Sequence, residues 1–138
     1  MASIDQYPPI KIAILNDIHA VRASQRGSWL ADQLGYSPAD RTRLGTAILE
    51  VGRNIVKYAS PGQIVLTVIH EGERIGIQVI AHDSGPGIDD LERALTDRFT
   101  TGQSLGLGLP GIKRLTDDLQ IATQVGTGTT VTFIKWAT

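Results

Sequence analysis

The segment that most constrains this chain is Asp83-Ser84-Gly85-Pro86-Gly87, which follows the apolar run at residues 75–81. A β-branched run that ends in Asp-x-Gly-x-Gly predicts a buried strand that carries one carboxylate into a loop. The two glycines let the backbone approach a flat ligand, and Pro86 fixes part of the turn. The carboxylate can accept a hydrogen bond from an exocyclic amine such as that of adenine. Because the same residues also form ordinary turns, the interpretation depends on the flanking sequence.

Length and charge exclude several classes of protein. The 138 residues allow a single domain, 1–138, with a real core, and the apolar fraction of 41% is typical of a globular protein. The formal net charge of −1 gives no basic surface for nucleic acid. The sequence has neither a signal peptide nor an apolar run of about 18 residues, so we expect no membrane association. The absence of cysteine is compatible with the cytoplasm, where we place the protein.

The N-terminal part predicts a strand and a helix. Residues 9–15 alternate enough to form an edge strand. Asp17 stands at the N-cap position of a helix over residues 17–34 that ends at Gly35. We expect the core-facing residues of this helix to be Ile18, Val21, Trp29, Leu30 and Leu34.

A second helix begins with Ser37 as cap and Pro38 at the first helical position, and it ends near residues 60–62. Glu50 and Asn54 are one turn apart beside its apolar stripe. Two internal glycines, each costing up to ~1 kcal/mol against alanine, indicate that another segment approaches this helix closely. The stripe consists of Leu44, Ile48, Val51, Ile55 and Tyr58, and the glycines are Gly45 and Gly52.

The remaining sequence predicts four strands, at residues 63–70, 74–82, 120–125 and 129–136. We expect a short helix at 88–96, an aperiodic loop at 97–105, and a helix after it that turns Ile112, Leu115 and Leu119 toward the core. The order of elements indicates an α+β fold, a two-layer sandwich with helices on one face of a mixed, mostly antiparallel sheet.

Gly106-Leu107-Gly108 precedes the last predicted helix. Glycines expose backbone N–H groups, and a helix N-terminus favours an anion, so this turn can hold phosphates. It is neither a Rossmann fingerprint nor a Walker A motif. Such a turn is also a common helix entry.

Glu50 and Asn54 have a similar pair of interpretations. They are ordinary polar residues of an amphipathic helix, or they are functional. An amide oxygen is a suitable ligand for Mg²⁺, and a carboxylate one turn away can deprotonate a hydroxyl. Three such motifs in this order are more specific than any one of them.

Together these motifs resemble the N, G1 and G2 boxes of the GHKL superfamily, which includes gyrase, the heat-shock chaperone, histidine kinases and MutL. The resembling segments are Glu50-x-x-x-Asn54, Asp83-x-Gly85-x-Gly87, Gly106-x-Gly108 and Gly126-x-Gly128-Thr129. The match extends from about residue 40 to the end of the chain. It implies the Bergerat ATP-binding fold, with ATP and Mg²⁺ as cofactors and residues 97–105 as the lid over ATP.

Within the superfamily, the chain looks most like the RsbT-type switch kinases of bacterial stressosome modules. The motifs that carry this resemblance lie at residues 99–102, 108–115 and 134–136. It implies a protein serine/threonine kinase that phosphorylates a STAS-domain partner and, once released, activates a PP2C-type phosphatase. The alternative is an ATP-dependent binding module of the anti-sigma-factor type, which sequesters a sigma factor. Glu50 favours the kinase, because nucleotide binding alone needs no base.

The resemblance also implies a role for each motif residue. Glu50 is the general base on the acceptor hydroxyl, Asn54 holds Mg²⁺, and Asp83 accepts from the adenine amine. Lys57 departs from many RsbT-like chains, and it either reaches a phosphate or is a solvated lysine. The glycines shape the adenine pocket or cradle phosphates, and a threonine supports the adenine site: Gly85, Gly87, Gly106, Gly108, and Thr129 or Thr130.

Overall fold

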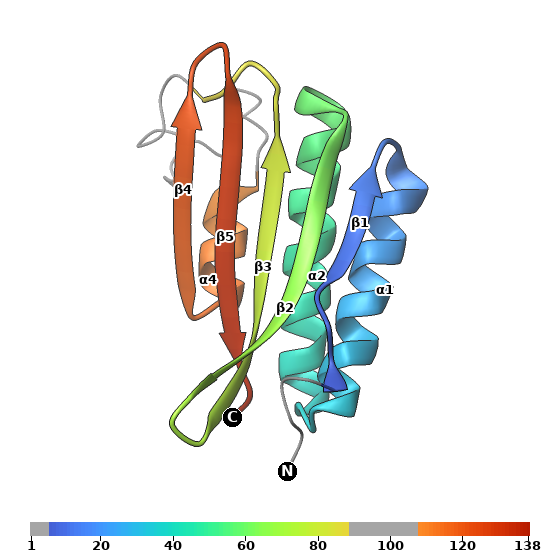
Figure 1. The fold of residues 1–138 in the computed structure, drawn as a ribbon, viewed down its shortest axis with the longest axis vertical. Helices are drawn as coiled ribbons and strands as arrows, with labels where there is room; N and C mark the ends of the chain where they lie inside the picture. The colour runs from blue at the N-terminus through green and yellow to red at the C-terminus, as the bar shows by residue number, and fades with distance from the viewer. Residues whose placement is uncertain (1–5, 89–107) are drawn as a thin grey trace.

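The computed structural model describes residues 6–88 and 108–138. Five strands form one sheet in the order β1-β2-β3-β5-β4, and the helices cover one of its faces (Figure 1). All four strand pairs of this sheet are antiparallel. The predicted α+β sandwich is therefore confirmed. The strands are β1 (Ile10–Ile14), β2 (Gly62–Glu71), β3 (Arg74–Asp83), β4 (Asp118–Gln124) and β5 (Gly128–Trp136).

Two predicted features lie outside the described residues. The predicted helix at 88–96 falls there except for Ile88, and so does the whole 97–105 loop. Gly106, the first glycine of the predicted phosphate turn, is also outside.

Helix α1 (Asp17–Gln33) occupies almost the predicted range, but its N-cap is Asn16 and not Asp17. Asn16 has an extended backbone, and its side-chain oxygen accepts from the backbone N–H of His19 at 3.2 Å. Asp17 lies in the first turn instead, where a carboxylate is favoured by the helix dipole.

The predicted core face of α1 is wrong for its largest residues. Ile18 is 61% exposed, Trp29 is 49% exposed, and Val21 is also exposed. The reason is that α1 packs closely against α2 (Pro38–Asn54): a Cβ on Gly52 would lie 2.8 Å from the Cβ of Ala20. Only small side chains fit such a contact, so the face of α1 that packs on α2 carries small residues and the large ones lie on the other face. The buried residues of α1 are Ala20, Ala23, Gly27, Leu30 and Ala31.

Helix α2 begins as predicted, with the Ser37 hydroxyl accepting from the backbone N–H of Asp40 at 3.1 Å. It continues into a π-helical turn, η2 (Ile55–Ala59). A π-helical turn holds an extra residue, so it rotates the side chains that follow. Tyr58, predicted on the core stripe, is therefore 39% exposed, while the other four residues of the stripe are buried.

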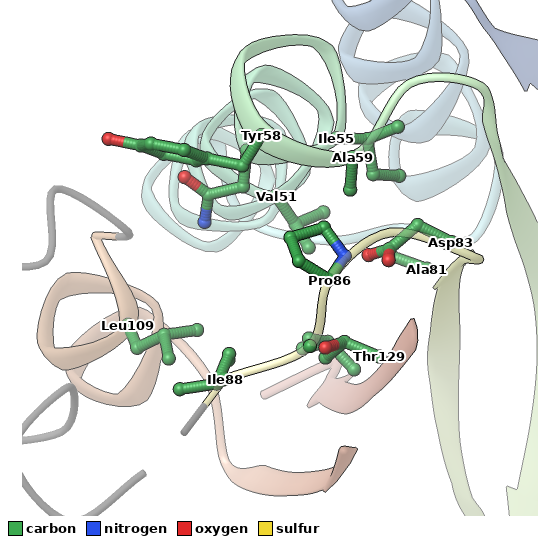
Figure 2. Close-up of a pocket in the computed structure, with 13 residues that line it drawn as sticks. Val51, Ile55, Tyr58, Ala59, Ala81, Asp83, Pro86, Ile88, Leu109 and Thr129 are labelled. Carbon is green, nitrogen blue, oxygen red and sulfur yellow. The ribbon is translucent and has the colours of Figure 1, made fainter. Parts of the chain in front are cut away.

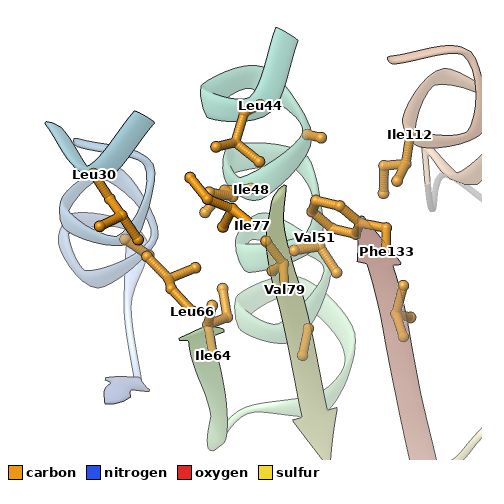
Figure 3. Packing of buried hydrophobic residues seen from close by; sticks show 14 of the residues in the cluster. Leu30, Leu44, Ile48, Val51, Ile64, Leu66, Ile77, Val79, Ile112 and Phe133 are labelled. Carbon is orange, nitrogen blue, oxygen red and sulfur yellow. The ribbon is translucent and has the colours of Figure 1, made fainter. Parts of the chain in front are cut away.

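The core lies between the sheet and the helices (Figure 3). Ile77, Val79 and Phe133 of the sheet pack with buried residues of α2 and with Ile112 of α4 (Leu109–Leu115). Helix α4 is shorter than predicted, because Thr116 is already extended and its hydroxyl donates to the carbonyl of Ile112. Leu119 was therefore wrongly assigned to this helix.

A cluster of polar side chains lies at the end of the core near the C-terminus. We name it the Asp40 cluster, and it consists of Asp40, Arg43, Asp117, Lys135 and Thr138. The Lys135 ammonium lies 3.4 Å from Asp40 Oδ1 and 3.2 Å from Asp117 Oδ2. Arg43 contacts Asp40 at 2.9 Å, and the Thr138 hydroxyl donates to the same carboxylate. The cluster joins the start of α2 to β5 and to the residue just before β4.

Candidate active site

A cavity opens between α2, η2, the loop after β3 and the start of α4 (Figure 2). It contains about 480 Å³ of empty space, including its open mouth. Its wall is mostly apolar with a few polar side chains, which is typical of a small-molecule site. The lining residues are Val51, Asn54, Ile55, Tyr58, Ala59, Ala81, Asp83, Pro86, Gly87, Ile88, Leu109, Thr129 and Val131.

Asp83 is the last residue of β3, one residue beyond the predicted end of the strand, and it lines this cavity. Its Oδ1 accepts from the backbone N–H of Gly85 at 2.9 Å, which fixes the side chain. Within the described residues, Oδ2 has no hydrogen-bond partner. The carboxylate is therefore held in place and keeps one oxygen to accept from a ligand.

Gly85 and Gly87 bring the loop close to two neighbouring segments. A Cβ on Gly85 would lie 2.5 Å from the Cβ of Ala59 in η2. Gly87 has φ +78, and a Cβ there would lie 2.5 Å from the carbonyl oxygen of Gln124. Side chains at these positions would clash with Ala59 and with Gln124, so both glycines let the loop pack as it does at the cavity.

The structure separates the two candidate threonines. Thr129 pairs with Asp83 across β3 and β5, is 7% exposed and lines the cavity. Thr130 points to the other face of the sheet, where its hydroxyl lies 2.8 Å from His82 Nδ1. Thr129 is therefore the one that is placed to meet a ligand.

Glu50 and Asn54 take different positions at the cavity. Asn54 lines it, whereas Glu50 does not. Glu50 lies beside Gly108, the N-cap residue of α4, which has φ +63. A Cβ on Gly108 would lie only 2.8 Å from Glu50 Oε2. Packing thus joins the predicted base to the predicted phosphate turn, although they are far apart in the sequence.

Sequence reasoning missed several apolar residues of the wall, and it placed Tyr58 in the core. Tyr58 and Ala59 reach the cavity through the π-helical turn, which no sequence pattern indicates. Lys57 is exposed, and its ammonium lies 5.1 Å from the centre of the Tyr58 ring. The Tyr58 ring is therefore a neighbour of the Lys57 ammonium within the described residues.

The described residues contain no group of three or more histidine, aspartate or glutamate side chains that could hold a metal ion by itself. Asn54, whose side chain carries an amide oxygen, lines the cavity. Mg²⁺ usually takes one or two protein ligands and completes its shell with phosphate and water. This donor set therefore fits Mg²⁺ bound together with a nucleotide.

Comparison with known proteins agrees with the geometry. Residues 39–137 match the family described as Histidine kinase-, DNA gyrase B-, and HSP90-like ATPase. The serine/threonine-protein kinase RsbT of Bacillus subtilis (strain 168) is 40% identical over 125 residues, which are 91% of this chain and 94% of RsbT. The anti-sigma F factor of Thermoanaerobacter sp. (strain X514) is 30% identical over 77% of each chain.

Solved structures show the same fold. The RsbU and RsbW domains of Rv1364c from Mycobacterium tuberculosis match with a TM-score of 0.64 and 20% identity, over 94% of this chain and 32% of that one. The mycobacterial sensor histidine kinase MprB matches with a TM-score of 0.54 and 18% identity, over 95% and 97%.

The match to the ATPase family covers the cavity and all the motif residues around it. The identity to RsbT extends over nearly the whole of both chains. The chain therefore belongs to the GHKL ATPases that share the histidine kinase, gyrase B and HSP90 domain, and within them to the RsbT-type serine/threonine-protein kinases.

Proposed function

We propose that this kinase transfers the γ-phosphoryl group of ATP to a serine or threonine of a STAS-domain partner, and that its release lets it activate a PP2C-type phosphatase. We place this partner switch in the cytoplasm. Among the described residues, no helix is long and apolar enough to cross a membrane.

The contact between Glu50 and Gly108 is the observation that carries the proposal. It places a carboxylate beside the turn that is expected to hold the phosphates. No hydrogen bond or ion pair engages this carboxylate within the described part of the chain. A site that only bound nucleotide would need no such group, whereas phosphoryl transfer to a hydroxyl uses a base.

The roles of the other residues follow from their positions. Asp83 accepts from the adenine amine, and Gly85, Gly87 and Thr129 shape the adenine end. Asn54 holds Mg²⁺, which neutralises charge on the phosphates when bound. Glu50 takes the proton of the acceptor hydroxyl while the hydroxyl oxygen of the acceptor attacks the γ-phosphorus. The bond from that phosphorus to the bridging oxygen breaks, and ADP leaves.

Gly108 and Gly106 are proposed to cradle the phosphates through their backbone N–H groups. Gly108 is the N-cap residue of α4, so its backbone lies at the start of this helix, next to Glu50. Gly106 lies outside the described residues, and its role rests on the motif.

The outer face of α1 has the features of a surface that binds a protein partner. Large apolar side chains that are exposed together mark interaction surfaces, and Ile18, Val21 and Trp29 are exposed here. Arg22 and Arg26 lie on the same helix without an ion pair in the described residues, and Arg26 lies 5.8 Å from the Trp29 ring. We therefore assign this face to an acidic surface of the STAS-domain partner.

The test is to incubate the protein with Mg²⁺ and γ-labelled ATP together with purified candidate STAS-domain proteins. We expect label on a serine or threonine of one partner, and none when Mg²⁺ is chelated. ATP-dependent complex formation without label on any partner would contradict the kinase assignment.

A second function is an ATP-dependent binding module that sequesters a sigma factor, in place of phosphotransfer or together with it. The similarity to anti-sigma F factors favours it. Co-elution with candidate sigma factors, with and without ATP, distinguishes it from the first function, since the RsbT-type switch predicts no sigma-factor complex.

A further inference from the structure

The π-helical turn η2 packs against the chain on both sides of Asp83. Gly62 pairs with Asp83 across β2 and β3, and a Cβ on Gly62 would lie 2.6 Å from Cγ2 of Ile55, the first residue of the turn. Gly85 holds the Asp83 side chain through its backbone N–H, and it packs in the same way on Ala59, the last residue of the turn. Figure 2 shows Ile55, Ala59 and Asp83 on one side of the cavity. The two ends of the turn therefore contact the two segments that carry the carboxylate.

The contact between Ala59 and Gly85 is limited by size and not by backbone conformation. Gly85 is not one of the glycines with positive φ, so alanine can adopt its backbone conformation. A Cβ there would lie 2.5 Å from Ala59 Cβ and 2.9 Å from Ala59 Cα. Gly85 itself does not line the cavity. A methyl group on Gly85 would therefore act on the position of the loop, and it would not occupy the space of a ligand.

The extra residue of the π-helical turn decides which side chain makes this contact. An α-helix has 3.6 residues per turn, so one residue more or fewer rotates all the following side chains by about 100°. Turns of this kind occur frequently at functional sites. Here the turn ends at Ala59. In a regular α-helix Ala59 would point in another direction, and Gly85 would lose this support.

We propose that η2 is a positioning element of the nucleotide site, in which Ala59 acts through Gly85 to fix the direction of the Asp83 carboxylate. A carboxylate that is already oriented binds a donor without first losing conformational freedom, so ligand affinity depends on this support. The inference rests on the proposed use of ATP. It adds a residue that acts on ATP affinity through the loop that it holds.

The experiment measures Mg²⁺-ATP affinity by calorimetry and stability by thermal melting in wild type, Gly85→Ala, Ala59→Gly and the double variant. Gly85→Ala creates the clash, and Ala59→Gly removes the Cβ atom that causes most of it. The nearest remaining atom is then the Cα of residue 59 at 2.9 Å, so we expect a partial recovery. Gly111→Ala is the matched control, because its φ is not positive either and the nearest atom to its Cβ is Arg114 Nη2, at 3.8 Å.

We expect Gly85→Ala to weaken ATP binding by about 5- to 150-fold, the usual effect of forcing one methyl group into a packed contact. The double variant should bind ATP at least about fivefold more tightly than Gly85→Ala, because residues in contact are coupled. Ala59→Gly alone should weaken ATP binding by about two- to fivefold, since the loop loses part of its support. Gly111→Ala should bind ATP like wild type.

The Asp83→Asn background distinguishes positioning from a general loss of structure. If Ala59 and Gly85 act through the carboxylate, Gly85→Ala should cost less than about twofold in ATP affinity once that carboxylate is gone. Should Gly85→Ala fail to fold, Ala59→Gly in the two backgrounds makes the same comparison. Thermal melting of each variant shows whether it is folded at the temperature of the binding measurement.

Three results would overturn the role of Ala59. These are wild-type ATP affinity in a folded Gly85→Ala, a double variant that binds no more tightly than Gly85→Ala, and an equal loss with and without the Asp83 carboxylate. A wild type that bound no ATP would instead overturn the proposed function.

Discussion

Two carboxylates at opposite ends of the molecule are used in different ways. Asp83 ends β3 at the cavity, and within the described residues the only hydrogen-bond partner of its side chain is the backbone N–H of Gly85. Asp40, near the start of α2, is 3% exposed, and Arg43, Lys135 and Thr138 of the Asp40 cluster contact it. One carboxylate keeps an oxygen open, and the other is saturated by its own chain.

The pKa of Asp40 reflects this saturation. The hydrogen bond from Thr138, together with Arg43 and Lys135, lowers the pKa of the Asp40 carboxyl below its usual range, against the opposing effect of burial. The difference between the two carboxylates teaches which polar residues serve stability and which serve function. A polar group that its own chain satisfies stabilises the fold, whereas a group left open to a ligand contributes little until the ligand binds.

The largest effect is expected at Glu50. Glu50→Gln removes the base but keeps the size of the side chain, so phosphotransfer to the partner should fall by about 10²- to 10⁴-fold. ATP affinity and thermal stability should stay near wild type, because Glu50 does not line the cavity. Label transfer, calorimetry and thermal melting on the same preparation measure all three, and transfer at the wild-type rate would exclude this base.

Asn54→Ala is the contrast to this variant. It removes the amide oxygen that we assign to Mg²⁺, so both ATP affinity and transfer rate should fall. The Glu50→Gln protein should also remain bound to its STAS-domain partner, since release depends on phosphorylation. If Glu50→Gln weakened ATP binding as much as Asn54→Ala does, Glu50 and Asn54 would not have separate roles.

Asp83→Asn should reduce ATP affinity by roughly 5- to 150-fold, the consequence of a buried polar mismatch of about 1–3 kcal/mol. The physical reason is that an amide can place a donor where the adenine amine needs an acceptor. Stability should change little, because Oδ1 can still accept from Gly85. Calorimetry with Mg²⁺-ATP measures the effect, and unchanged affinity in a folded variant would remove the adenine assignment.

Asp40→Asn should show the reverse pattern, with a loss of about 1–3 kcal/mol in the free energy of unfolding and unchanged ATP affinity. The loss should depend on pH. Because the folded pKa is lowered, the Asp40 charge stabilises the fold above the unfolded pKa of about 3.9, and this contribution disappears as pH falls through the folded pKa.

Urea unfolding of wild type and Asp40→Asn from neutral to acidic pH checks this prediction. The difference between the two proteins should be constant above about pH 5 and should shrink at lower pH. A difference that grew on acidification would show that the Asp40 charge does not stabilise the fold.

The smallest effect is expected at Trp29, which lies neither at the cavity nor in the cluster around Asp40. Trp29→Ala should weaken binding of the STAS-domain partner by about 1 kcal/mol, or roughly fivefold, since it removes an exposed aromatic side chain from the proposed interface. ATP affinity and stability should stay within about 0.5 kcal/mol of wild type. Binding of immobilised partner measures the change, and wild-type affinity would remove α1 from the interface.

Much of this protein was predictable because the relevant interactions lie within a few residues of each other in the chain. The sequence predicted the strands at 63–70 and 74–82, which pair as β2 and β3, and the Ser37 cap predicted where α2 begins. The apolar strand that ends in Asp83 placed a carboxylate in a loop, and the structure has it at the cavity. Periodicity and capping act locally, so sequence alone determined these elements and the α+β class.

Only the tertiary structure decided which residues from different elements meet. The contact of Ala20 with Gly52 turned the large side chains of α1 outward. The π-helical turn rotated Tyr58 out of the core. Thr123 reaches Ile88 across 35 positions of sequence. Such contacts depend on how closely two surfaces approach in three dimensions, and no local pattern of residues records that distance.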